Sequence, residues 1–403
     1  MVKSKWKEYL LRDIGIFRKG SGISRDESQT GTIPAVRYGE IYTTHHNYVR
    51  RYKSHISEEV ARRALQVKYG DILFACSGET KEDIAKCVAI VDEKEVYAGG
   101  DIIVLSPTVK TNPIFLGYIL NTADIIRQRA QLAQGDAIVH ISVSAIQSIM
   151  ITMPEYEEQC SIATALSDID ALITNLEKLI AKKKAIKQGA MQELLTGKRR
   201  LKGFRGDWHD IAIGSFADVY AGGTPSTANP AYWDGDIPWM SSGELNKKVV
   251  SCVQGRITQA GLENSSTRII PAHCVLIGLA GQGKTRGTAA YNTISLCTNQ
   301  SIAAILPNPS EFDSKFLYYY MDTQYKALRE LSDGGGGRGG LTKKLIEEFS
   351  VRIPVDLEEQ VAIASVFTDI DYEIEKLVKE LNKYRGIKSG MMSELLTGRI
   401  RLV

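Results

Sequence analysis

The stretch EEQCSIATALSDIDALITNLEKLIAKKKAIKQGAMQELLTGKRRL, residues 157–201, recurs without a gap as EEQVAIASVFTDIDYEIEKLVKELNKYRGIKSGMMSELLTGRIRL, residues 358–402. The two copies are 201 positions apart throughout, and 23 of their 45 positions are identical. Within 403 residues, a segment of ordinary domain size precedes each copy. The chain is therefore an internal duplication, in which each half consists of a variable segment followed by a shared one.

Both shared segments have the residue spacing of a long helix. Their apolar residues step alternately by four and three, and no proline interrupts them. Pro154 and Pro354 precede the copies, and Gly197 and Gly398 end them, which suits a helix start and a helix stop. Each apolar stripe must be buried, and the comparable stripe lies in the other copy. We therefore expect an antiparallel pair of helices, the alternative being a helix that pairs with a second chain. The predicted seam consists of Ile162, Leu166, Ile169, Ile173, Leu176, Ile180, Ile363, Phe367, Ile370, Ile374, Leu377 and Leu381.

Four lysines, at 182–184 and 187, interrupt the first shared segment. Such a run usually marks a solvated helix face. Lys183 and Lys187 fall on the apolar register, so we expect the seam to loosen near that end.

The variable segments share a layout more than a sequence. Each has a tryptophan near its start, an Ile-Pro pair and later a Phe-Leu pair at matching places. Short apolar runs at 71–75, 87–91, 275–279 and 302–306, bounded by Gly, Asn and Pro, predict strands, and two shorter helices are expected near 113–133 and 313–331. The expected fold class is α+β. Two mixed α/β domains, 1–153 and 203–353, alternate with two long helices, 154–202 and 354–403.

Composition and motif absences favour a binding protein over an enzyme. The hydrophobic content of 43% is typical of a folded protein. The net charge of +3 is too small to indicate a nucleic-acid partner by itself. Neither a signal-like N-terminus nor an apolar run long enough for a membrane span is present, so a cytoplasmic protein without a membrane partner is expected. The cysteines and histidines have no metal-ligand spacing, and no carboxylate cluster suggests a nuclease. We predict no catalytic and no metal-binding residue.

One motif argues otherwise. Residues 278–285 read GLAGQGKT, a literal match to the phosphate-binding P-loop. That chemistry needs a strand before the loop and a helix after it. Residues 286–294 lack helical periodicity, so a hairpin is expected instead. A P-loop nucleotide hydrolase with a coiled-coil arm is therefore a disfavoured alternative. The same loop suits the presentation of Lys284 and Arg286 to a phosphodiester backbone or a base edge.

Polar loops and basic stretches beside predicted strand ends are candidate contacts to double-stranded DNA. Residues 41–57, for example, contain arginine, lysine, histidine and tyrosine but no acid. Basic side chains supply affinity through phosphates, and bases are read by a few side chains in loops. The alternative for each candidate is a solvated surface position, and for Trp239 a place in the core. The candidates are Lys19, Ser21, Arg37, Tyr38, His45, Arg50, Arg51, Lys53 and Ser77 in the first domain, and Thr224, Ser226, Trp239, Ser241, Ser242, Lys284, Arg286 and Arg338 in the second.

The alternation of variable domain and shared helix resembles the specificity subunit of type I restriction-modification systems, over the whole chain. The most specific elements are the twin EEQ and ELLTG motifs, GKRRLKGF at 197–204 and GGTPSTANPAYWDGDIPW at 222–239. The first domain departs from the last motif, with GSGIS at 20–24 in the place of its Thr-Pro-Ser.

The resemblance implies that each domain reads one half of a bipartite, asymmetric DNA site, and that the helices set the spacing and dock two methyltransferase subunits. Those subunits would bind S-adenosylmethionine and methylate adenine, and restriction subunits would use ATP and magnesium for cleavage. No cofactor is expected in this chain. A stand-alone DNA-binding regulator is a third alternative.

Overall fold

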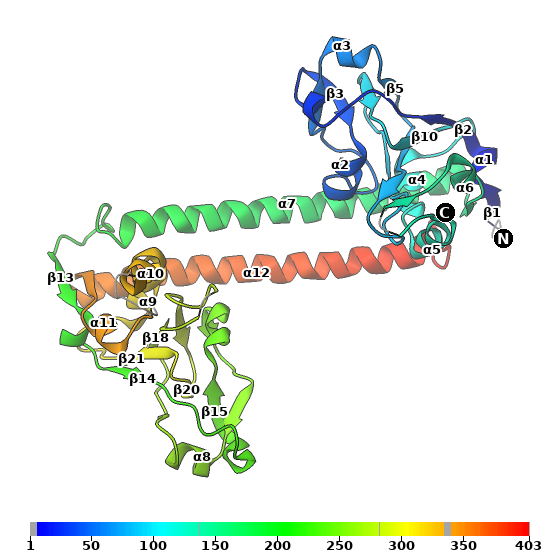
Figure 1. Cartoon of the computed structure of the whole chain (residues 1–403). Coiled ribbons are helices and arrows are strands. Elements are labelled where there is room, and N and C mark those ends of the chain that lie inside the picture. The colour runs from blue at the N-terminus through cyan, green and yellow to red at the C-terminus, as the bar shows by residue number, and fades with distance from the viewer. Residues whose placement is uncertain (1–5, 137, 282, 334–339, 403) are drawn as a thin grey trace. The chain divides into compact units, whose positions relative to one another are not determined.

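The computed structural model describes residues 6–136, 138–281, 283–333 and 340–402. The chain divides into two compact units, unit 1 with residues 1–177 and 379–403, and unit 2 with residues 178–378. The two long helices, α7 (Tyr156–Leu194) and α12 (Leu357–Leu395), are continuous (Figure 1). Each unit therefore contains one variable segment, the first part of one long helix and the last part of the other.

Unit 1 is built on two four-stranded sheets. The first has the antiparallel order β2 (Gly15–Lys19), β10 (Ile102–Pro107), β6 (Ile72–Ala75) and β8 (Cys87–Ala89). The second has the order β4 (Ser54–Ile56), β3 (Ile33–Val36), β9 (Val96–Ala98) and β5 (Leu65–Val67), with β3 and β9 parallel. Two short pairs complete the strands: β1 (Lys7–Leu10) with β12 (Met150–Met153), and β7 (Ser77–Gly78) with β11 (Val139–His140).

Short helices connect these strands. They are α1 (Leu11–Ile14), η1 (Asp26–Ser28), α2 (Tyr38–Thr43), α3 (Glu58–Ala61), α4 (Pro113–Ile119), α5 (Ala123–Leu132) and α6 (Val143–Gln147). Side chains alternate between the two faces of a strand, so β6, β8 and β10 of the first sheet each contribute to two cores. Phe74 packs with Phe115, Ile162 and Leu395 of the helices, while its neighbour Leu73 packs toward the second sheet.

Unit 2 repeats this plan. Its larger sheet has the order β14 (Val219–Ala221), β21 (Ile302–Ile305), β18 (Val275–Gly278), β19 (Ala289–Asn292) and β16 (Val249–Val250). The smaller has the order β17 (Gly255–Ile257), β15 (Trp233–Met240) and β20 (Cys297–Thr298), with β15 and β20 parallel. β13 (Trp208–Ala212) pairs with β22 (Ser350–Pro354). Four strands of the larger sheet thus follow the same order as the first sheet of unit 1.

The helices of unit 2 are η2 (Ile213–Ser215), η3 (Pro230–Tyr232), η4 (Ser242–Lys247), α8 (Gln259–Glu263), α9 (Ser314–Thr323), α10 (Tyr325–Asp333) and α11 (Lys343–Glu347). Asp313 caps α9 by accepting a hydrogen bond from the N–H of Phe316, as Asn112 does for Phe115 at α4. The predicted strands and the α+β class are confirmed, and each predicted shorter helix is a pair of helices, α4 with α5 and α9 with α10.

The long helices run antiparallel within each unit. In unit 1, Glu158, Asp170 and Glu177 of α7 pair with Arg401, Lys388 and Arg385, so the partner number falls as the α7 number rises. In unit 2, Lys183, Lys187 and Arg200 pair in the same sense with Glu373, Asp371 and Glu359. The predicted loosening at Lys183 and Lys187 is replaced by ion pairs, because carboxylates occupy the facing positions.

The predicted seam residues differ in burial between the two helices. All six on α7 are buried, as are Ile363, Phe367 and Leu381 on α12, while Ile370, Ile374 and Leu377 are half-buried. In the described part of the chain, none of the helices is long and apolar enough to cross a membrane.

Candidate nucleic-acid interface

Three strand ends of unit 1 meet at the connection between β9 and β10. The register places Lys19 opposite Ile103, Ala75 opposite Ile102, and Val36 opposite Ala98. The segments that follow these strand ends must therefore converge. We call residues 19–21, 37–38, 76–78 and 99–101 the rim of unit 1. Four predicted DNA contacts besides Lys19 fall on it, namely Ser21, Arg37, Tyr38 and Ser77.

The rim of unit 2 is formed in the same way at the connection between β20 and β21. Ala221 lies opposite Ala303, Gly278 opposite Ile302, and Met240 beside Thr298. The rim consists of residues 222–226, 241–242, 279–281, 283–287 and 299–301. It brings together Thr224, Ser226, Ser241, Ser242, Lys284 and Arg286 of the predicted set.

On the rim of unit 1, three of the predicted contacts, Lys19, Ser21 and Tyr38, are exposed, and Arg37 is half-buried. Lys19 and Tyr38 are exposed, Tyr38 at the first turn of α2. The Ser21 hydroxyl donates to the carbonyl of Arg63 at 3.0 Å. Arg37 is half-buried, and its backbone N–H donates to the carboxylate of Glu40 at 3.4 Å. Lys19 and Tyr38 therefore present a cationic and an aromatic group to solvent on this rim.

Three predicted contacts in unit 1 do not face solvent freely. His45 is 3% exposed, and its Nε2 lies 3.9 Å from Glu40. Ser77 is 7% exposed, and its hydroxyl hydrogen-bonds Nδ1 of His140 at 3.0 Å. Arg50 leaves the predicted patch for the long helix, with an ion pair to Asp170 at 2.7 Å. Burial and local partners engage these polar groups, so we leave all three out of the proposed contacts.

The rest of the basic stretch remains outside. Arg51 and Lys53 are exposed, and Lys53 directly precedes β4, the antiparallel neighbour of β3. They extend the positive charge beside the rim of unit 1.

Trp239 stabilises the loop at residues 222–226 on the rim of unit 2. It is half-buried, its indole N–H donates to the carbonyl of Gly223 at 3.0 Å, and its ring lies edge-on to Trp233 with centroids 5.1 Å apart. Trp233 in turn donates to the carbonyl of Ser226 at 3.2 Å. Both indoles thus hold the 222–226 loop, which fixes the position of Thr224 between them. Arg338 lies outside the described residues.

Two residues of the rims, Gln300 and Asp101, are not among the predicted contacts. Gln300 hydrogen-bonds the Thr224 hydroxyl at 2.5 Å from the β20–β21 connection. Asp101, in the corresponding connection of unit 1, has a φ of 58°, a left-handed conformation. The signal that would have found them is the strand register, because both are remote in sequence from the loops that they join.

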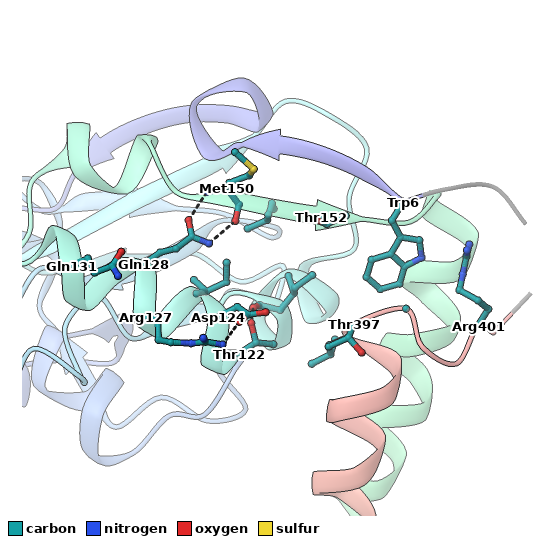
Figure 2. A pocket seen from close by; sticks show the side chains of 15 residues that line it. Trp6, Thr122, Asp124, Arg127, Gln128, Gln131, Met150, Thr152, Thr397 and Arg401 are labelled. Atoms are coloured by element: carbon teal, nitrogen blue, oxygen red, sulfur yellow. Dashed lines mark hydrogen bonds and ion pairs between the residues drawn. The ribbon is translucent and has the colours of Figure 1, made fainter.

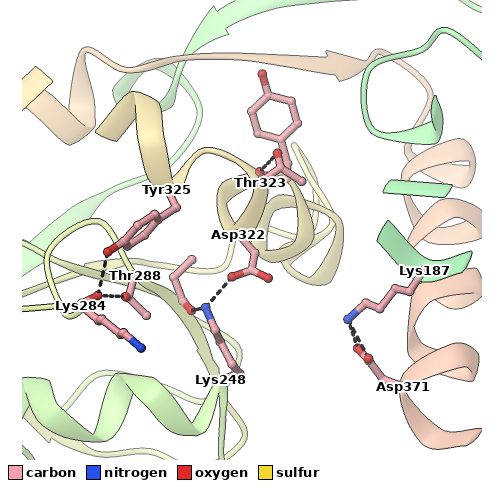
Figure 3. Close-up of polar contacts among 10 residues, drawn as sticks. Lys187, Lys248, Lys284, Thr288, Asp322, Thr323, Tyr325 and Asp371 are labelled. Carbon is pink, nitrogen blue, oxygen red and sulfur yellow. Dashed lines mark hydrogen bonds and ion pairs between the residues drawn. The ribbon is translucent and has the colours of Figure 1, made fainter. Parts of the chain in front are cut away.

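The GLAGQGKT segment is part of a hairpin. β18 and β19 are antiparallel neighbours, and residues 283–287 form turns between them. The carbonyl of Lys284 accepts a hydrogen bond from the Thr288 hydroxyl at 2.6 Å, as Figure 3 shows. The Lys284 side chain is exposed. Arg286 is half-buried. The hairpin prediction is confirmed, and the helix N-terminus that a phosphate-cradling loop requires does not follow this strand.

A tyrosine hydroxyl and a cysteine thiol lie beneath the rim of unit 1. The Tyr42 hydroxyl donates to the carbonyl of Ser77 at 3.0 Å, and burial raises the pKa of Tyr42 well above its ordinary value. Burial and the neighbouring Asp101 likewise raise the pKa of Cys76. Both groups therefore stay neutral at physiological pH and add no negative charge to this rim.

Known proteins that are similar to this chain belong to type I restriction-modification systems. The family model of the type I restriction modification DNA specificity domain matches residues 3–188 and 205–383. A protein of Methanocaldococcus jannaschii named as the MjaX type I restriction enzyme specificity subunit is 27% identical, covering 100% of this chain and 95% of its own length. The EcoR124I/EcoR124II specificity subunit of Escherichia coli is 24% identical over 69% of this chain and 70% of its own.

The fold is that of a solved relative. The crystal structure of the type I restriction-modification S subunit from M. genitalium aligns with a TM-score of 0.66 at 15% identity, covering 98% of this chain and 97% of that chain. Two copies of one family domain, two rims built by the same strands and a matching whole-chain fold lead to one conclusion: the chain belongs to the family of type I restriction-modification DNA specificity domains.

Proposed function

We propose that this chain is the specificity subunit of a type I restriction-modification complex and that it reads a bipartite, asymmetric DNA site. It is not an enzyme in this proposal. The observation that carries it is the pair of rims. The same strand ends form each rim, but Lys19, Ser21 and Arg37 line one where Thr224, Ser241 and Lys284 line the other. Because the two rims carry different side chains, they recognise two different DNA half-sites.

The proposed target recognition domains are residues 1–153 and 203–353, and the proposed shared helices are residues 154–202 and 354–403. Exposed cations supply affinity through phosphates, and rim side chains discriminate bases. We propose as DNA contacts Lys19, Ser21, Arg37, Tyr38, Arg51 and Lys53 of unit 1, and Thr224, Ser226, Ser241, Ser242, Lys284 and Arg286 of unit 2. Trp239 acts by positioning Thr224.

The chemistry of the complex belongs to its other subunits. Two methyltransferase subunits that bind S-adenosylmethionine methylate adenine in each half-site, and restriction subunits supply ATP- and magnesium-dependent cleavage. The chain itself needs no cofactor and acts in the cytoplasm, where the DNA is. One solved structure with a similar fold concerns complex assembly of the type I restriction-modification system, which supports this assignment of partners.

The test is a map of adenine methylation in the source genome, with this gene intact or deleted. One split motif with a constant spacer should lose its methylation on deletion and regain it on complementation. In the control, this gene is restored in a strain whose methyltransferase subunit is catalytically inactive, and methylation must not return. If every split motif persists in the deletion strain, the proposal fails.

The alternatives give opposite results. A P-loop hydrolase would bind ATP, and the Lys284→Ala variant would lose that binding. A stand-alone regulator would bind one DNA site with nanomolar affinity in the absence of a methyltransferase. Isothermal titration with ATP and a footprint with the purified chain distinguish them.

A further inference from the structure

A three-residue connection crosses from one sheet to the other within each rim. In unit 1 it consists of residues 99–101, between β9 and β10, and in unit 2 of residues 299–301, between β20 and β21. We call each a central connection. In unit 1, β10 lies between β2 and β6, and β9 lies beside β3. The other loops of the rim therefore flank the central connection, so its side chains lie in the middle of the proposed DNA surface.

The two central connections are anchored by the same three backbone hydrogen bonds. Each bond joins the connection, or the first residue after it, to the end of a different neighbouring strand. In unit 1 the bonds run from Gly99 N–H to the Val36 carbonyl at 2.9 Å, from Cys76 to Asp101 at 2.9 Å and from Gly20 to Ile102 at 2.8 Å. In unit 2 they run from Asn299 to Met240 at 3.0 Å, from Leu279 to Ser301 at 2.8 Å and from Gly222 to Ile302 at 3.1 Å. The two backbones are therefore equivalent, and the side chains decide what each connection can bind.

The exposed side chains of the two connections have different chemistry. In unit 1, two glycines precede Asp101, which is exposed and has a φ of 58°, where glycine is favoured. Its carboxylate has no hydrogen bond or ion pair with any residue that the structure describes. In unit 2, Gln300 is exposed, and its Oε1 accepts a hydrogen bond from the Thr224 hydroxyl at 2.5 Å. The loop of Thr224 is held in turn by the Trp239 indole.

We propose that each central connection reads one base pair, with Asp101 reading a cytosine in one half-site and Gln300 an adenine in the other. This inference rests on the proposed function. A carboxylate only accepts hydrogen bonds and is repelled by phosphates, so Asp101 suits the 4-amino group that cytosine presents in the major groove. The 6-amino group of adenine lies beside the N7 acceptor, which repels a carboxylate.

The amide of Gln300 matches adenine for a different reason. An amide can accept a hydrogen bond from the 6-amino group and donate one to N7 at the same time. The Thr224 hydroxyl occupies one lone pair of Oε1, which orients the amide and leaves the second lone pair and both Nε2 hydrogens for a base. Guanine presents only acceptors at the corresponding atoms, so it cannot satisfy Oε1.

The test exchanges the two chemistries by substitutions that keep the side-chain shape. In the deletion strain, complementation with Asp101→Asn should shift the preference at one pair of one half-site from cytosine to adenine. Gln300→Glu should shift one pair of the other half-site from adenine to cytosine. Methylation sequencing measures the methylated fraction at every genomic site that differs from the wild-type motif at one position. We expect each preference to change about 5- to 150-fold, the range of one good bidentate contact.

Matched controls carry the same two changes away from the rim. Asp124→Asn and Gln131→Glu alter exposed residues of α5, which Figure 2 shows in a groove that Trp6 and Thr397 also line. None of the described residues that line this groove belongs to the rim. Both control variants should methylate the wild-type motif.

A second pair of variants removes the proposed contacts without replacing them. Asp101→Gly suits the left-handed backbone, and Gln300→Ala shortens an exposed side chain, so both should fold. Each should make degenerate the same base pair that the first variant at its position alters. Circular dichroism of the purified chains verifies the fold.

The failures are distinguishable. If the wild-type gene restores no split motif, the proposed function fails and this inference with it. If wild type restores the motif but the variants keep its base preferences within twofold at every position, only this inference is overturned. A uniform change over all sequences, or loss of all methylation by a variant that folds, would give these residues a role in affinity alone and also overturns it. If Asp101→Asn or Gln300→Glu does not fold, the absence of a degenerate pair in Asp101→Gly or Gln300→Ala overturns it.

Discussion

Lys388 of α12 lies 2.6 Å from Asp170 of α7, inside unit 1. The corresponding pair of unit 2, Lys187 and Asp371, is 2.7 Å apart and appears in Figure 3. In both units the carboxylate also accepts a hydrogen bond from a tyrosine of the sheet domain, Tyr118 at 2.5 Å and Tyr319 at 2.9 Å. Burial raises the pKa of each tyrosine, so each hydroxyl remains a donor. One carboxylate per unit therefore joins both helices to the domain.

Replacing this carboxylate should destabilise unit 1. Asp170→Asn removes the charge that Lys388, Arg50 and Tyr118 share, and we expect it to lower the free energy of unfolding by about 2 to 3 kcal/mol, the scale of a hydrogen bond to a charged group. Urea unfolding followed by circular dichroism measures it. Asp168→Asn, two positions away and exposed, is the control and should change stability by less than about 0.5 kcal/mol. Equal losses in both variants would refute the role of Asp170.

Acidification should weaken the loop beneath the basic stretch through Glu40. Burial acts to raise the pKa of Glu40, but the nearby His45 ring and hydrogen bonds from the Ser54 hydroxyl and the Arg37 N–H lower it below its ordinary 4.5. A depressed folded-state pKa contributes stability above pH 4.5, and that contribution is lost as the pH falls through the folded value. Unfolding free energies measured from pH 7 to pH 3 should therefore fall less steeply in Glu40→Gln than in wild type. Parallel curves would contradict the prediction.

Alanine should have opposite effects at two glycines of one helix end. Gly189→Ala should raise the free energy of unfolding by about 1 kcal/mol, because the added Cβ meets nothing. Gly197→Ala should lower it by roughly 1 to 2 kcal/mol, since Gly197 has a φ of +69° and its Cβ would lie 3.2 Å from the ring of Trp208. Thermal unfolding of both variants checks the signs. The same sign for both would show that helix propensity alone governs this region.

Lys284→Ala should weaken DNA binding without affecting the fold. Loss of one phosphate contact should reduce the slope of log affinity against log salt by about 1. Anisotropy of a labelled duplex across a salt series measures the slope. The control is Lys315→Ala, exposed in unit 2 but away from the rim, whose slope should match wild type. An unchanged slope in Lys284→Ala would remove this residue from the interface.

Arg37→Ala should relax one half of the recognised site. A lost base contact costs about 1 to 3 kcal/mol of discrimination at one position. In a complemented deletion strain, methylated sites should become degenerate in one half of the split motif and remain unchanged in the other. The mirror experiment, Ser241→Ala in unit 2, should affect the opposite half. Degeneracy in both halves after either change would contradict the assignment of one rim to each half-site.

The elements that follow from local pattern were predictable from the sequence. The heptad rhythm, the proline and glycine boundaries and the short apolar runs mark α7, α12 and the buried strands β6, β8, β18 and β21, because periodicity and breakers act over a few residues. Once the strand order is known, it also predicts that the loops of each rim lie together at the strand ends. That order depends on pairing between distant segments, which no local pattern encodes.

The errors in the site have a common origin. The basic stretch at 41–57 was predicted as one exposed patch, but His45 folds inward to Glu40 and Arg50 turns to Asp170. Lys183 and Lys187 were expected to loosen the seam, and facing carboxylates hold them instead. In each case the partner lies far away in sequence or on another element. Charge composition alone therefore overstates how many cations are available to DNA.

The division of the chain into units has a consequence for biosynthesis. Unit 2 is one continuous stretch, 178–378, whereas unit 1 combines residues 1–177 with 379–403. Leu395 and Leu396 belong to the core around Phe115 and Leu166, and Arg401 forms the buried pair with Glu158. A ribosome delivers residues 379–403 only after it has made all of unit 2, so unit 1 begins first but is completed after unit 2. A stop codon shortly before Leu395 would therefore leave the apolar core of unit 1 exposed to solvent. Proteases would degrade such a truncated chain before it could enter a complex.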